Sequence, residues 1–425
     1  MRNTKNVIAR SALARRSNPV NRVTLFWVVS RCALAMTLPL ILLTNCSKSE
    51  VTVAQEGRVT LTPTFEHQID TKESKAPFQF TPSLPIHLEK TPHAFSISHK
   101  SAHLFGDHEH IYLCSSKGIE RFSLSQKKWD SPILLPISDM DGPIFMTMDS
   151  KSIVLVSRLG LLKVFDRNTH KLIFEKDFAA AVNATPLLDE GKIFVQFSGN
   201  FIHCVNAQNG EELWAYHTHP NPGLEQGSSP IIHKNLLITG FSTGDLSAID
   251  KNNGLLQWND SLFGQISLFN NDLLHISSKP IVEREWTYAI GAADNMSVFK
   301  TKTGELIWSK HIGSQNNLLI NNNYLYVFDH KGYLTSLNKI NGKVRMVSNI
   351  KEHVCIPFYF TNMLVVNDTI FIISVSKKES QGVFIDPQSG KIKEMIPIDA
   401  PIKDVSIFDH QLVALSDKKL YVFSN

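Results

Sequence analysis

The 425-residue sequence predicts an all-β fold, an eight-bladed β-propeller with four-stranded antiparallel blades. Two observations predict it. From about residue 104 onward the chain resembles itself at intervals of 38 to 50 residues, a period that is typical of propeller units. Within each unit the apolar runs are short, rich in β-branched and aromatic residues and bounded by Asn, Gly, Asp and Lys, and no window has the spacing of an amphipathic helix.

Three consecutive units, at residues 185–214, 229–258 and 279–308, carry the clearest copies of the repeat. Each starts with a proline and two apolar residues, continues with two strand-like runs, and ends in a turn glycine followed within four residues by tryptophan. These pairs are Gly210 with Trp214, Gly254 with Trp258, and Gly304 with Trp308. We expect the glycine to provide the positive φ of a tight hairpin, and the tryptophan to pack between neighbouring sheets.

The number of units sets the number of blades. They begin near residues 104, 143, 185, 229, 279, 317, 363 and 401, which gives eight blades, or seven if the weak first or last unit does not form one. The last unit stops at Tyr421–Phe423 without a glycine–tryptophan strand. We expect a strand from the lead-in, around Phe95–Ser98, to complete that sheet and close the ring, because closure removes exposed sheet edges.

The first 45 residues have the pattern of a signal peptide. They hold seven basic residues and no acidic one, and they end in an apolar run of 12 residues, too short to cross a bilayer as a helix. Leu43-Thr44-Asn45-Cys46 follows, which is similar to a bacterial lipobox, where the cysteine is acylated. We expect a lipoprotein signal peptide at 1–45, a tether and lead-in strand at 46–95, and the propeller at 96–425. An organelle transit peptide is the alternative.

Charge and reactive groups exclude several functions. Outside the leader, 36 basic residues face 39 acidic ones with no basic patch, so nucleic acid is not an expected partner. Cys114, Cys204 and Cys355 lie in apolar runs, where we expect buried thiols. No serine elbow, phosphate loop or dinucleotide motif is present.

Histidines gather in two places, Asp107–His110 with His103, and His217 with His219. Both fall in polar turns, where solvated side chains are the expectation and a transition-metal site is the alternative. We therefore predict no catalytic, cofactor-binding or metal site.

Residues 206–214 (NAQNGEELW) and 300–308 (KTKTGELIW) resemble the PQQ-type propeller repeat. With the lipobox and the length, they make the chain similar to a divergent member of the BamB family, the propeller lipoproteins of the outer-membrane β-barrel assembly machine. The resemblance implies a scaffold that is not an enzyme, monomeric within a hetero-complex, and held on the periplasmic face of the outer membrane by an acylated, palmitate-bearing Cys46.

In that family two loops on one face of the ring bind a POTRA domain of the barrel-inserting subunit, BamA. The matching positions here are Leu224, Glu225, Gln226 and Gly227 in the first loop, and His275 and Ser277 in the second. Gln226 stands at the family's arginine, and His275 and Ser277 stand at its two aspartates. A propeller that binds another protein or a small ligand, or a quinone-linked enzyme, remains the alternative, although the Cys-Cys pair of quinoproteins is missing from the sequence.

Overall fold

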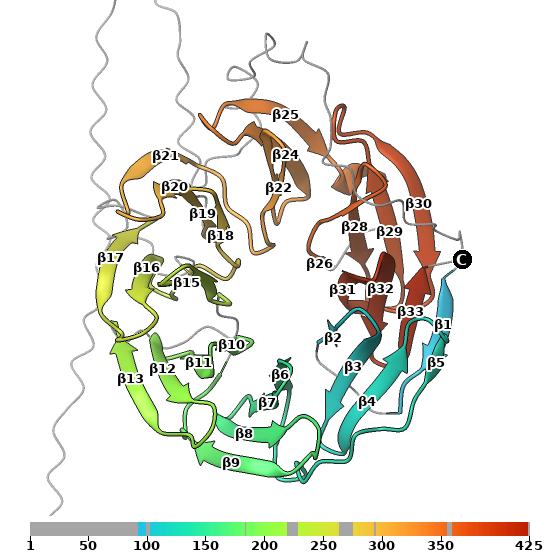
Figure 1. Cartoon of the computed structure of the whole chain (residues 1–425). Helices are drawn as coiled ribbons and strands as arrows, with labels where there is room; N and C mark the ends of the chain where they lie inside the picture. Colours follow the sequence, from blue (N-terminus) through green and yellow to red (C-terminus); the bar gives the residue numbers. More distant parts are fainter. Residues whose placement is uncertain are drawn as a thin grey trace, which may run out of the picture. The chain divides into compact units, whose positions relative to one another are not determined.

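The computed structural model describes residues 92–98, 103–182, 184–218, 228–262, 275–292, 295–354 and 359–423. They form eight antiparallel sheets around a central axis (Figure 1), which confirms the all-β fold and the eight blades. The predicted signal peptide, Cys46 and the tether up to residue 91 lie outside the described residues, and the boundaries of these segments remain predictions. None of the described residues forms a helix long and apolar enough to cross a membrane.

Blades one to three each consist of four consecutive strands, innermost first. Their bounds are β2 (Phe105–Gly106), β3 (His110–Ser115), β4 (Gly118–Ser123) and β5 (Lys128–Trp129); β6 (Ile144–Met148), β7 (Ser152–Ser157), β8 (Leu161–Asp166) and β9 (Leu172–Asp177); and β10 (Leu187–Asp189), β11 (Lys192–Phe197), β12 (Phe201–Asn206) and β13 (Glu212–His217). The two-residue edge strands of the first blade explain why its repeat is weak in the sequence.

Blades four to six follow the same order. Their strands are β14 (Ile231–His233), β15 (Leu236–Gly240), β16 (Asp245–Asp250) and β17 (Leu256–Ser261); β18 (Ile281–Glu283), β19 (Trp286–Ile290), β20 (Met296–Lys300) and β21 (Leu306–Lys310); and β22 (Leu319–Asn321), β23 (Tyr324–Phe328), β24 (Tyr333–Asn338) and β25 (Val344–Asn349). A short 3₁₀ turn, Lys351–His353, follows β25.

The last two blades depart from this order. Blade seven has five strands, β26 (Tyr359–Phe360), β27 (Leu364–Val366), β28 (Thr369–Val375), β29 (Ser380–Ile385) and β30 (Ile392–Ile398), while blade eight takes β31 (Ile402–Phe408), β32 (Gln411–Ser416) and β33 (Lys419–Phe423) from the end of the chain and β1 (His93–Ser96) from its beginning. β1 pairs antiparallel with β33, with Ala94 opposite Tyr421. The expected closure by a lead-in strand is thus confirmed, two residues earlier than Phe95–Ser98.

The hydrophobic core is divided among the seams between blades. Eight clusters of buried side chains occur, one for each pair of neighbouring blades, including a cluster that joins blade eight to blade one. In β3, Ile111 and Leu113 face blade eight, whereas Tyr112 and Cys114 face blade two. Because both sheet faces are covered, middle strands such as β7 and β28 contain continuous apolar runs, Ile153–Val156 and Ile370–Ile373, and do not alternate with polar residues there.

Tryptophan side chains pack between consecutive blades, as the repeat predicts. Gly254 and Gly304 have φ of +75° and +73°. A Cβ built on Gly254 would lie 2.8 Å from the Trp214 ring, and one on Gly304 would lie 2.8 Å from the Trp258 ring. Each tryptophan therefore packs on the turn glycine of the next blade, where only glycine fits. In blade two Phe174 takes this role against Gly210.

Candidate functional site

The two predicted partner loops occupy equivalent positions in neighbouring blades. Each connects the outermost strand of one blade to the innermost strand of the next, β13 to β14 and β17 to β18. Such connections lie at the same end of every blade, so the two anchor points share one face of the ring. Within these loops Leu224, Glu225, Gln226 and Gly227 lie outside the described residues, while His275 and Ser277 are described.

A hydrogen bond joins the points where the two loops return to the ring. Ser228 is fully buried, and its Oγ donates to the carbonyl of Ser278 at 3.0 Å. Ser278 donates its own Oγ to the carbonyl of Asn316 in the next blade at 2.5 Å. These bonds fix the bases of the two loops relative to each other. Sequence reasoning missed them, although a pair of serines precedes the inner strand in both units, at residues 228–229 and 277–278.

His275 lies inside the base of the second loop. Its side chain is 6% exposed, and its carbonyl accepts a hydrogen bond from the amide of Ala292 at 3.0 Å. Burial lowers the pKa of the imidazole, which favours the neutral form. Its Nδ1 and the Oγ of half-buried Ser277 are buried atoms without a hydrogen-bond partner among the described residues. His275 is therefore placed to support the loop from within, and it does not present its ring to a partner.

Polar side chains form hydrogen bonds across the seam between blades three and four. Asn200, in the turn between β11 and β12, accepts hydrogen bonds at Oδ1 from the amide and hydroxyl of Ser242 at 3.0 and 2.9 Å. Deeper in the seam, Gln196 donates its Nε2 to the carbonyl of Gly240 at 2.9 Å and accepts the hydroxyl of Thr239 at 2.5 Å. These bonds cross from blade three to blade four and stabilise the seam between them.

Aromatic rings line the stem of the first loop. His217, at the end of β13, stacks on Phe201 with ring centroids 5.3 Å apart, and Phe201 stacks on Phe197 at 4.7 Å. His203 meets these rings edge-on, and its Nδ1 lies 2.7 Å from a Glu212 carboxylate oxygen. The exposed His217 thus extends a stack that runs through half-buried Phe201 to buried Phe197, and it lies at the end of β13, where the connection to the next blade begins.

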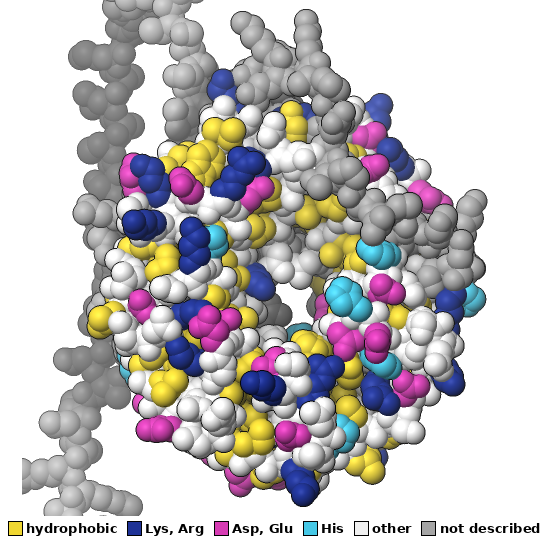
Figure 2. All heavy atoms as spheres, in the orientation of Figure 1, with side chains coloured by type: hydrophobic (Ala, Val, Ile, Leu, Met, Phe, Trp, Pro, Cys, Tyr) yellow, Lys and Arg dark blue, Asp and Glu magenta, His cyan; other side chains and the backbone are white. Residues whose placement is uncertain are grey.

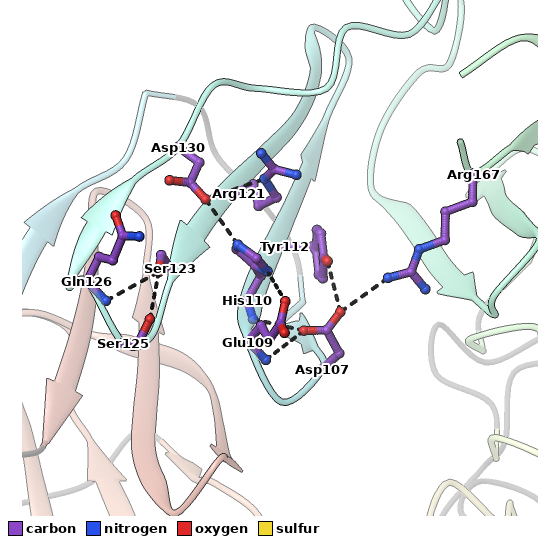
Figure 3. Close-up of polar contacts among 10 residues, drawn as sticks. All are labelled: Asp107, Glu109, His110, Tyr112, Arg121, Ser123, Ser125, Gln126, Asp130 and Arg167. Carbon is purple, nitrogen blue, oxygen red and sulfur yellow. Dashed lines mark hydrogen bonds and ion pairs between the residues drawn. The ribbon is translucent and has the colours of Figure 1, made fainter. Parts of the chain in front are cut away.

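The denser histidine group is used for turn formation (Figure 3). Asp107 accepts hydrogen bonds from the amides of Glu109 and His110 at 2.9 and 2.8 Å, and from the hydroxyl of Tyr112 at 2.9 Å. Burial opposes ionisation of Asp107, but these amide bonds outweigh it, so the pKa of the carboxyl lies below its usual value. The carboxylate therefore caps the turn between β2 and β3.

The remaining contacts of this group hold strands and blades together. Arg167 reaches from blade two to within 3.4 Å of Asp107 Oδ2, and His110 Nε2 lies 3.0 Å from Asp130 Oδ2 (Figure 3). Over the described ranges, no three His, Cys, Asp or Glu side chains are grouped to hold a metal ion. His219 lies outside those ranges.

The thiols match the prediction where they are described. Cys114 and Cys204 are buried and not in disulfides. Desolvation raises the pKa of both thiols to about 12, so the reactive thiolate is not formed at neutral pH. Cys355 lies outside the described residues.

Comparison with known families and curated proteins gives consistent results. The model of a family described as "Outer membrane protein assembly factor BamB" matches residues 122–346, more than half of the chain. The curated protein of that name from Moranella endobia is 23% identical over 203 residues, which cover 46% of this chain and 51% of the relative. Its namesake from Shewanella oneidensis is 22% identical over 270 residues, covering 62% of this chain and 64% of the relative. The matched regions thus span about half to just under two thirds of these relatives.

Among solved structures, the crystal structure of BamB from Moraxella catarrhalis is similar with a TM-score of 0.65. The match covers 78% of this chain and 98% of the other at 15% sequence identity. At that identity the likeness concerns the fold alone.

Proposed function

Since the chain belongs to the family of the outer membrane protein assembly factor BamB, we propose that it is a non-catalytic scaffold lipoprotein of the machine that assembles β-barrel proteins in the outer membrane. The family match is the observation that carries the proposal. The closed ring supports it as well, because eight packed seams make a rigid body from which loops can be presented to a partner.

The proposed anchor is Cys46, acylated after removal of residues 1–45. Two or three acyl chains hold a protein on a membrane where one would not, and Ser47 after the cysteine favours the outer membrane. Mass spectrometry of the purified N-terminal peptide tests this. A peptide that begins at an acylated Cys46 is the expected result, and an unmodified Cys46 in the mature protein would contradict the anchor.

The proposed partner surface is the loop-bearing face, and the partner is the POTRA region of the barrel-inserting subunit. The Ser228–Ser278 hydrogen bond would keep the two loops at a fixed spacing, as simultaneous contact with one domain requires. Gln226 and Ser277 are uncharged, and Glu225 is the one charged residue among the proposed contact positions, so we expect the contact to be polar and only weakly sensitive to salt.

Deletion of residues 220–227 tests the partner surface. Affinity capture of the tagged protein from cross-linked, gently solubilised envelopes, read by mass spectrometry, should recover the barrel-inserting subunit with the intact chain and much less of it with the deletion. The control is Gln208→Ala with Asn209→Ala, in the β12–β13 turn at the opposite end of the blade. Equal recovery by the deletion variant would refute the loop assignment, and no recovery by the intact chain would refute the scaffold function.

A further inference from the structure

The segment 275–278 lies across the seam between blades four and five, at the base of the second candidate loop. The amide of Ile276 donates a hydrogen bond to the carbonyl of Phe241, in the β15–β16 turn, at 3.1 Å. The carbonyl of His275 accepts one from the amide of Ala292, in the β19–β20 turn, at 3.0 Å. The segment is thus bonded through its backbone to a turn of each blade.

The same pair of backbone hydrogen bonds occurs at the seam between blades two and three. There the amide of Val182 donates to the carbonyl of Arg158 at 2.8 Å, and the carbonyl of Ala181 accepts the amide of Ser198 at 2.8 Å. Ala181 is therefore the structural equivalent of His275. The backbone contact belongs to the repeat, and at the seam between blades four and five an imidazole has been added to it.

This imidazole is enclosed without a compensating charge. His275 is 6% exposed, and its Nδ1 has no hydrogen-bond partner among the described residues. The elements around it carry the described charged groups Asp245, Asp260 and Lys279, of which Asp245 accepts the hydroxyl of Thr243 at 2.7 Å. Within the described ranges none of these groups contributes to the lowered pKa of the imidazole, which results from desolvation alone. A proton on His275 would therefore make a buried cation without a counter-ion, which is costly.

Histidines at the surface are in a different situation. Those visible in Figure 2 lie among basic and acidic side chains and in contact with solvent, which accommodates a proton. His275 favours the neutral form as long as the seam is closed. The closed seam is therefore fully stabilised above the ordinary pKa of histidine, about 6.5, and this stabilisation declines as the pH falls below that value.

We propose that protonation of His275 releases the segment 275–278 from the two turns, so that acid opens the seam between blades four and five at this end. The imidazolium then reaches water, and the two backbone hydrogen bonds are lost. The blades themselves stay together, because the apolar cluster of this seam, which includes Trp258 and Phe299, contains no titratable group. Since His275 and Ser277 are proposed partner positions, acid should also weaken partner capture. That consequence rests on the proposed function, whereas the release does not.

Hydrogen exchange of the purified, detergent-solubilised full-length protein at about pH 7.5 and about pH 5 tests the release. Exchange rates are corrected for the intrinsic effect of pH on amides. We expect protection of the Ile276 and Ala292 amides to fall severalfold in acid, whereas the equivalent amides of Val182 and Ser198, at a seam with alanine in place of histidine, keep theirs. Equal changes at the two seams would overturn the proposal.

Two variants remove the group that takes the proton. His275→Ala gives the segment the residue that stands at position 181, and His275→Phe retains a ring. Either should abolish the effect of pH at Ile276 and Ala292. His311→Phe replaces an exposed histidine in the next connection along the ring and should behave as the wild type does. Urea unfolding at both pH values checks that the variants are folded. A pH effect that persists without the imidazole would refute the proposal.

NMR titration of the histidine rings in the wild-type protein tests the same step directly. The His275 signal, assigned by its absence from either variant, should titrate below the ordinary value of about 6.5, over the pH range in which Ile276 loses protection. An ordinary midpoint, or a titration without loss of protection, would contradict the proposal. Affinity capture repeated at both pH values examines the consequence separately, because undiminished capture despite lost protection would count against the proposed partner surface alone.

Discussion

The indole Nε1 of Trp258 donates a hydrogen bond to the carbonyl of Thr301 in the next blade at 2.8 Å. The same relationship joins Trp214 to Lys251 at 3.1 Å and Trp308 to Lys339 at 3.2 Å. Each tryptophan thus covers the next turn with its ring and satisfies a carbonyl in that turn with its nitrogen. The contact therefore stabilises the seam between two consecutive blades.

Replacing Trp258 should therefore weaken the seam between blades four and five. We expect Trp258→Ala to lower the free energy of unfolding by about 3–5 kcal/mol, because it leaves a cavity and an unpaired carbonyl. Urea unfolding followed by circular dichroism measures this loss. Leu255→Ala, three residues away and 62% exposed, should change it by no more than about 0.5 kcal/mol. Similar losses in both variants would show that the seam does not depend on the indole.

Alanine substitutions at two glycines with nearly the same φ distinguish the cost of backbone strain from the cost of close packing. Gly304 and Gly191 have φ of +73° and +72°, but a Cβ at Gly304 would meet Trp258, whereas one at Gly191 would meet nothing within 4 Å. Both alanine variants carry the cost of a left-handed residue, about 1–2 kcal/mol. The free energy of unfolding should fall by about 1–3 kcal/mol more in Gly304→Ala than in Gly191→Ala, because the indole of Trp258 must move. Urea unfolding measures the difference. Equal losses would contradict the packing described here.

Closure of the ring depends on Phe95, which lies in β1 with its ring 4.7 Å from that of Phe122 in blade one. Phe95→Ala should lower the free energy of unfolding by about 1–2 kcal/mol, because the half-buried apolar surface of the ring is lost. Hydrogen exchange should then accelerate in β33 and β4, on both sides of this seam, before it changes elsewhere. Ser96→Ala, at the exposed neighbouring position of β1, is the control and should leave exchange unchanged.

Asp329 predicts a stability that depends on pH. Desolvation raises the pKa of this buried carboxyl, and its Oδ2 has no hydrogen-bond partner among the described residues. A raised pKa means that folding favours the protonated form, so this stabilisation is present in acid and is lost as the pH rises through the folded-state pKa. Asp329→Asn should therefore unfold at higher urea than wild type at pH 7, with a difference that shrinks toward about pH 4. A difference that does not vary with pH would refute this.

Ser228 tests whether the bases of the two candidate loops are coupled. Ser228→Ala leaves the carbonyl of Ser278 unpaired, and we expect the free energy of unfolding to fall by about 1–2 kcal/mol, with faster amide exchange at residues 276–279. Ser198→Ala removes a similar bond, from Oγ to the carbonyl of Ala181, but at an exposed site, and it should have little effect. Unchanged exchange at residues 276–279 in Ser228→Ala would show that the bases of the two loops are not coupled through this bond.

The parts of the fold predicted from the sequence are those that depend on neighbours in the chain. Gly210 and Trp214 mark a hairpin and its outer strand because turn chemistry and strand preference act over a few residues. The Ser228–Ser278 bond joins units about 50 residues apart, and its geometry exists only once the ring has formed. The burial of His275 could not be predicted for the same reason, since a polar residue between strands usually lies in solvent.

The pairing of His93 with Val422 also sets an order in time. These partners are 329 positions apart, so β1, the first of the described strands, cannot pair until β33, the last of them, has been synthesised. Contacts at such separations form slowly because a long loop must close before they are gained. Until then the chain has two open ends, each with an unpaired blade face that can associate with other chains. Protection by chaperones would thus be needed until the last strand has been made and has paired.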